Sequence, residues 1–319
     1  MECGKKFNVG ICWLKVLACF GVVNSHYGVH IEGEVAALPV PVFIFCSIYI
    51  AYPALKKNGL NKLLDRLWRL LLPFWCWGIV YFILYSLHMK CIVPSKLIWQ
   101  LTFGHSVCKP LFFLPLLGMI TIVAYALSRF RRGFMLWSIF LIVFSLCMQH
   151  TGLNYRIFCD YPDEMRWTCG RFLEVLPVAI GACLLSTFLQ SRKHNILWLC
   201  VAISTGLIVL FLFNLHYRII PRCEGFTKQG LGLFLGSIGI GSLFIAIGEL
   251  LLKKGEESIL VRMSRLMFGV YLLHVLAAQF FELIFKRQHS LVESAVVFSV
   301  SLVVAGVLSK FRYIKKVIL

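Results

Sequence analysis

Apolar runs of about 18 to 23 residues recur along this whole chain, and short polar stretches separate them. A run of that length forms a helix that can cross the ~30 Å hydrocarbon core of a bilayer. Backbone groups inside lipid must bond to one another, so helices are the expected form of such runs. Charged residues make up 14% of the 319 residues, against about 25% in soluble domains. The sequence therefore predicts an all-α, polytopic bundle of transmembrane helices.

We expect about ten spans in a single integral membrane domain, residues 1–319, because no gap between runs is long enough for a soluble domain. Lys5 and Lys6 precede the first run, but no small-residue cleavage site follows it, so we expect a span there rather than a cleaved signal peptide. The predicted spans are residues 10–29, 35–55, 67–88, 110–128, 133–149, 172–190, 196–213, 230–252, 266–285 and 291–309.

The formal net charge of +18 is distributed unevenly between the two sides of these spans. If the N-terminus is cytoplasmic, the segments on that side hold about twice as many lysines and arginines as the other segments. That asymmetry follows the positive-inside rule and predicts that both termini are cytoplasmic, in a multi-pass protein of the inner (plasma) membrane. Basic residues there can also contact anionic lipid. Nucleic acid is not an expected partner, because its binding needs a basic surface on a soluble fold.

Most of the 13 cysteines lie within apolar runs, where a thiol behaves as a small apolar side chain. No Cys/His spacing typical of a metal site occurs, so no metal is expected. Cys159 and Cys169 share a predicted outer loop and could form a disulfide if that side is oxidising. The sequence leaves this pairing open, together with the oligomeric state.

Lys15 and His26 lie in one apolar run, eleven residues apart. Eleven residues turn a helix through about 1100°, or three turns and ~20°, so both side chains project from one face, about 16 Å apart along the axis. Ionisable residues inside a membrane usually face a protein interior and mark a functional path. Two other interpretations remain: Lys15 could extend to the cytoplasmic surface, and His26 could be an interfacial histidine.

Arg66 and Arg69 follow the second span and share one helix face, since they are three residues apart. Two adjacent guanidinium groups suit a phosphate or pyrophosphate, because each can donate paired hydrogen bonds. They could equally bind lipid head groups and fix the topology.

Other polar residues lie at depth in the predicted spans. Ser47 can bond back to a carbonyl four residues earlier, and Tyr49 can lie at a helix contact. Tyr271 and His274 fall in a later span, with His274 roughly 12 Å deep. His274 could be a neutral histidine bonded to a neighbouring helix, or a second wall of the cavity that Lys15 and His26 line.

In their order along the chain, these motifs resemble the acyltransferase-3 family of integral membrane acyltransferases, which modify bacterial surface polysaccharides and related glycans. That family opens with a span carrying Arg, ten residues, then His, and Lys15 and His26 have this spacing. Its Ser-Gly-Phe/Tyr motif resembles residues 47–49, and its Arg-x-x-Arg motif resembles Arg66 and Arg69.

The resemblance extends to the later spans. A Trp-Phe-Leu-like start of the fourth span is matched loosely by Phe112–Leu114, and a Phe-Gly-Ile-Tyr-Leu-Leu-His motif by Phe268–His274. The chain departs from the family in three places: Lys15 replaces Arg, Ile48 replaces Gly, and the Trp of the fourth span is missing. A lysine offers a point charge in place of a planar, two-pronged donor.

The resemblance implies transfer of an acyl group, commonly acetyl, from cytoplasmic acyl-CoA to a hydroxyl of a cell-surface or lipid-linked glycan. It implies that Arg66 and Arg69 hold the phosphates of the cofactor, and that His26 and Lys15 are catalytic. The supporting residues that it implies are Ser47, Tyr49, Tyr271 and His274. A transporter of a glycan or small solute is the alternative, since carriers also place ionisable residues in the membrane, although the two halves show no convincing repeat.

Overall fold

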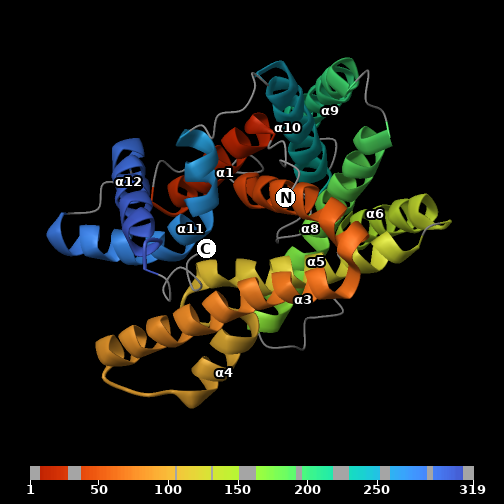
Figure 1. The fold of residues 1–319 in the computed structure, drawn as a ribbon. Coiled ribbons are helices and arrows are strands. Elements are labelled where there is room, and N and C mark those ends of the chain that lie inside the picture. The colour runs from red at the N-terminus through yellow and green to blue at the C-terminus, as the bar shows by residue number, and fades with distance from the viewer. Residues whose placement is uncertain are drawn as a thin grey trace.

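The computed structural model describes residues 8–27, 37–104, 106–130, 132–150, 163–191, 196–217, 230–251, 259–285 and 290–311. These residues form helices and turns and contain no strand, which confirms the predicted all-α class. Figure 1 shows their arrangement. The helices are α1 (Val9–Tyr27), α3 (Pro39–Met89), α4 (Pro94–Phe103), η1 (Lys109–Phe112), α5 (Phe113–Arg129), α6 (Phe134–His150), α8 (Asp163–Ser191), α9 (Ile196–Tyr217), α10 (Gly230–Leu251), α11 (Ile259–Ile284) and α12 (Leu291–Leu308).

Seven helical stretches among the described residues are long and apolar enough to cross a membrane. Two shorter apolar stretches, Phe134–Gln149 and Leu197–Leu212, coincide with two more of the predicted spans. The chain is therefore a multi-pass membrane protein, but neither the number ten nor the position of the termini is confirmed. The seven stretches are Val9–Tyr27, Pro39–Met89, Pro110–Arg129, Trp167–Leu189, Gly230–Leu250, Ile259–Ile284 and Leu291–Leu308.

A sharp bend divides α3 into a first limb, residues 39–58, and a second limb, residues 60–89. Gly59 forms this bend with φ 63° and ψ −141°, a conformation that side chains exclude and glycine adopts. The stretch between the second and third predicted spans was expected to be a cytoplasmic loop that runs into a helix, and it is helical on both sides of the bend. One glycine reverses the chain here, so no longer loop is needed (Figure 1).

Arg129, at the end of α5, supports this bend. Its guanidinium donates to the carbonyl of Leu55 at 3.1 Å and lies over the Tyr125 ring, 4.7 Å from the centroid. The Leu55 carbonyl belongs to the last turn before the bend, where helical carbonyls lose their own partners. Arg129 therefore satisfies a backbone group that the bend at Gly59 exposes.

Helix α1 packs against four other helices, α3, α10, α11 and α12. The approach to α10 is so close that a Cβ atom added at Gly10 would lie 1.7 Å from the carbonyl oxygen of Phe244. Small residues at such contacts let membrane helices pack backbone to backbone. The helix that carries Lys15 and His26 is therefore surrounded by protein over much of its surface.

A proline creates a polar contact between α6 and α8. Pro177 has no N–H, so the carbonyl of Leu173, four residues earlier, loses its helical donor. Ser145 and Gln149 of α6 donate to that oxygen instead, at 2.5 and 2.7 Å. The kinked helix is thereby attached to its neighbour.

One sequence-based question is not answered by the structure. Cys159 lies outside the described residues, so its pairing with Cys169 of α8 stays open.

Candidate active site

Two histidines from different helices lie against each other. The rings of His26 in α1 and His274 in α11 have centroids 5.7 Å apart and planes inclined by 27°. Seven residues earlier in each helix, the Cys19 thiol donates to the Met267 carbonyl at 3.5 Å. Seven residues are close to two helical turns, so the two helices present facing side chains again at the histidine pair.

Hydrogen bonding fixes the tautomer of His274. Its ring is fully buried, and Nδ1 lies 2.6 Å from the carbonyl oxygen of Tyr271. A carbonyl can only accept, so Nδ1 carries the proton. Nε2 is buried and makes no hydrogen bond within the described part of the chain. In the neutral ring, His274 therefore presents an unused acceptor beside His26, whose side chain is exposed on part of its surface.

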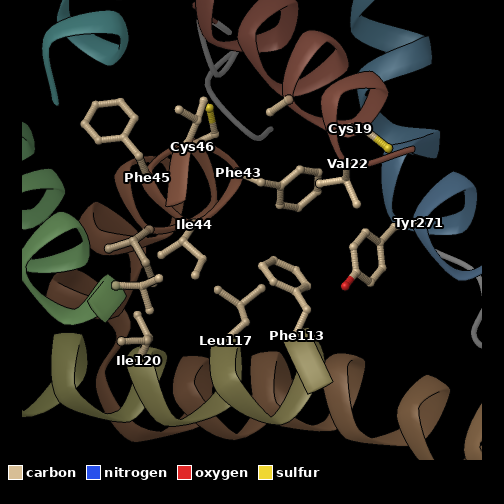
Figure 2. Packing of buried hydrophobic residues seen from close by; sticks show 14 of the residues in the cluster. Cys19, Val22, Phe43, Ile44, Phe45, Cys46, Phe113, Leu117, Ile120 and Tyr271 are labelled. Atoms are coloured by element: carbon tan, nitrogen blue, oxygen red, sulfur yellow. The ribbon is translucent and has the colours of Figure 1, made fainter. Parts of the chain in front are cut away.

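An aromatic cluster, formed by Phe43, Phe113 and Tyr271, lies next to this pair. The Phe113 ring is 5.3 Å from Phe43 and 4.9 Å from Tyr271 between centroids. Figure 2 shows these side chains converging from α3, α5 and α11. The Tyr271 hydroxyl donates to the carbonyl of Pro110 in η1, and the Tyr271 ring lies 5.6 Å from that of His274. The cluster therefore links the histidine pair to the start of α5.

Lys15 lies against Phe43, one of the three rings of the aromatic cluster. Its Nζ is 5.6 Å from the centroid of the Phe43 ring, and its side chain is half-buried. Its positive charge lies close enough to that of Arg66 for the two charges to repel each other. The structure thus brings Lys15 near one of the two predicted phosphate-binding arginines.

Arg66 points into the bundle, because the bend in α3 folds the second limb back. Its Nη2 donates to the Ser47 carbonyl at 3.2 Å, and its Nε donates to the Thr121 hydroxyl at 3.2 Å. Thr121 in turn donates to the Leu117 carbonyl at 2.7 Å. Among the described residues, neither Arg66 nor Lys15 forms an ion pair with a carboxylate. Two positive charges in an apolar interior favour an anion between or beside them.

Three predicted site residues lie elsewhere or act differently. Arg69 is exposed, so it does not share the surroundings of Arg66. Ser47 contributes its backbone carbonyl to the site. Tyr49 stacks on Phe45, with centroids 5.8 Å apart and planes at 14°. The Tyr49 ring therefore packs on a residue of its own helix.

Sequence reasoning missed a polar group in the first half of α8, which spans Asp163–Ser191. Glu174 is buried, and its Oε2 lies 2.6 Å from Nη1 of Arg171. The Arg171 guanidinium lies over the Trp167 ring at 5.2 Å. The sequence signal was a lone carboxylate within the apolar run of residues 172–190, where an ionisable residue is costly.

The helices and their apolar surfaces define a multi-pass membrane protein, and comparison with known families identifies its class. Residues 8–310 match the model of the acyltransferase-3 family, which describes an acyltransferase domain. The match covers nearly the whole chain, so the chain belongs to this family, as its motifs predicted. No curated protein and no solved structure matches the chain.

Proposed function

We propose that this membrane acyltransferase moves an acyl group, usually acetyl, from cytoplasmic acyl-CoA to a hydroxyl of a cell-surface or lipid-linked glycan. The observation that carries the proposal is the arrangement along α1. His26 meets His274 towards one end, and Lys15 lies near Arg66 towards the other. The first pair offers proton acceptors for a hydroxyl, and the second offers positive charge for a phosphorylated cofactor.

The donor side is the cationic pair, Lys15 and Arg66. Arg66 has two nitrogens bonded to protein, and its Nη1 makes no hydrogen bond among the described residues. Guanidinium and ammonium groups both bind phosphate oxygens. Arg69, being exposed, is proposed to meet the phosphates at the protein surface, before the acyl arm extends towards the aromatic cluster.

His26 is proposed as the general base. Its neutral imidazole takes the proton of the acceptor hydroxyl while the hydroxyl oxygen attacks the thioester carbonyl. A C–O bond forms, the C–S bond breaks, and the proton passes from His26 to the leaving thiolate of coenzyme A. A covalent acyl-histidine is the other route that His26 permits, with the same net balance.

Lys15 is assigned to the cofactor rather than to the reacting carbonyl. Eleven residues separate it from His26, a rise of about 16 Å. That exceeds the reach of a lysine side chain, so its charge acts on the cofactor phosphates or pantetheine arm. His274 and Tyr271 are proposed to orient the acceptor side, and the Ser47 carbonyl to orient Arg66.

The proposed setting is the inner (plasma) membrane, with both termini cytoplasmic and the glycan presented in the membrane or on its outer side. The acyl-CoA then enters from the side on which it is made. No metal takes part in this scheme.

The test supplies radiolabelled acetyl-CoA to membranes that contain the protein and to matched membranes that lack it. We expect radiolabel to appear in a glycan in the membranes that contain the protein, and not in the membranes that lack it. Movement of a solute across the membrane without label transfer would contradict the proposal and favour a carrier.

A further inference from the structure

We propose that Trp167, Arg171 and Glu174 of α8 form a binding subsite for a neutral, polyhydroxylated part of the acceptor. This subsite is separate from the place where the acyl group is transferred. It rests on the proposed function and specifies where the glycan lies.

Glu174 supplies the first observation. The residue is 3% exposed, and its Oε2 is paired with Arg171 at 2.6 Å. The other carboxylate oxygen, Oε1, is buried and makes no hydrogen bond with any residue that the structure describes. Buried polar atoms are rarely left unpaired, and those that remain so call for a partner that the protein does not itself provide. A hydroxyl group of a ligand would donate to Oε1 and satisfy it.

Trp167 supplies the second observation. Its half-buried ring meets the Phe112 ring edge-on at 4.2 Å, while the Arg171 guanidinium lies 5.2 Å from its centroid. An indole offers a broad apolar surface with polar groups at its border. Arginine donates and glutamate accepts, and a sugar hydroxyl can do both. The side chains of Arg171 and Glu174 carry opposite charges, so together they suit a neutral polyol better than a ligand with a single sign of charge.

Contacts connect this group to the histidine pair. Tyr271 lies against His274 and donates to the carbonyl of Pro110. Pro110 and Phe112 belong to the same short helix, η1, and Phe112 packs against Trp167. A glycan with its reacting hydroxyl at His26 could therefore follow this wall to α8. We infer that the acceptor extends beyond the ring that is acylated.

A purely structural role is the competing explanation, because an i, i+3 ion pair can simply stabilise the helix that carries it. The two explanations differ in what they predict. A structural pair affects use of both substrates alike, whereas a subsite affects the glycan alone.

The experiment measures KM for the glycan that becomes labelled in the transfer assay, and separately KM for acetyl-CoA. The variants are Trp167→Ala and Glu174→Gln, and Trp198→Ala is the matched control, because Trp198 is 74% exposed on α9. We expect KM for the glycan to rise about tenfold in both α8 variants, as loss of one good contact implies. KM for acetyl-CoA should stay as in the wild type, and the control should change neither value.

An unchanged KM for the glycan in both variants would overturn the subsite, as would equal rises in both KM values. If Trp167→Ala does not accumulate in membranes, the same measurement is made on Trp167→Phe. This variant retains an aromatic ring against Phe112. Absence of label transfer by the wild-type protein would refute the proposed function itself, which is a different result from refuting the subsite.

Discussion

At the scale of single residues, the separate surroundings of Arg66 and Arg69 are the most informative. Three residues apart on one helix, they would be expected to act together. Instead, Arg66 bonds to Ser47 and Thr121 inside the bundle, and Arg69 is exposed. Their contributions to donor binding should therefore be unequal.

We predict that Arg66→Ala raises KM for acyl-CoA by about tenfold or more, as expected for loss of hydrogen bonds to a charged group. Arg69→Ala, the matched control on the same helix, should have a smaller effect, and the double variant should weaken donor use more than acceptor use. Steady-state kinetics with each substrate varied in turn measures this. Equal KM values for acyl-CoA in the wild type and the double variant would exclude the phosphate role.

His26 carries the chemical step of the proposal. His26→Ala should lower the transfer rate by at least about 100-fold, the usual contribution of a general base. The protein should still insert into the membrane, because His26 is partly exposed and its loss leaves no large cavity. Quantifying acylated glycan against the amount of protein in the membrane tests this, and wild-type acylation in the variant would remove His26 from the mechanism.

At the scale of elements, the bend of α3 determines where Arg66 lies. The sequence predicted the two limbs of α3 as separate spans, because each contains its own apolar run. It predicted a loop that runs into a helix, but not a helix that continues on both sides of a sharp turn, since that turn depends on the dihedral angles of one residue, Gly59.

Gly59→Ala tests this bend. The φ of 63° with ψ of −141° is strained for any residue with a Cβ, at a cost of about 1–3 kcal/mol. The new Cβ would also lie 3.1 Å from a nitrogen of Arg129. We expect a lower thermal midpoint in detergent and weaker use of acyl-CoA, while Gly170→Ala in α8 should be tolerated, because its Cβ would meet nothing within 4 Å. An unchanged midpoint in Gly59→Ala would show that the bend does not need glycine.

The sequence also did not predict which helices pack against each other, for a related reason. The spacing of Lys15 and His26 predicted a shared face of one helix, but it could not indicate that α11 and α3 cover that face. Contacts such as His26 with His274 join residues 248 positions apart, and they depend on how whole helices pack. Glu174 is visible in the sequence as a lone carboxylate in an apolar run, but its unsatisfied oxygen depends on packing, which a sequence does not reveal.

At the scale of the whole molecule, the described helices account for a multi-pass membrane protein, and the uneven distribution of lysine and arginine predicts its orientation. The orientation matters for the proposed function, because the proposed donor, acyl-CoA, is made in the cytoplasm and the groups proposed to bind it should lie on that side.

Fusions to green fluorescent protein, which fluoresces when it folds in the cytoplasm, test this orientation. A fusion after Leu319 should be fluorescent, and one after Gly104 should not be, because residues 89–109 are predicted to be outside. Immunoblots of both fusions control for expression. Fluorescence from the Gly104 fusion alone would reverse the topology and with it the assigned donor side.

The helical stretch between Gly59 and Arg66 has a fixed length for a geometrical reason. One inserted or deleted residue would rotate the Arg66 side chain by about 100° around the helix axis. The guanidinium would then leave Thr121 and Ser47 and face another part of the bundle. Related chains that use an interior arginine in this way should therefore differ by substitution along this stretch, and not in its number of residues.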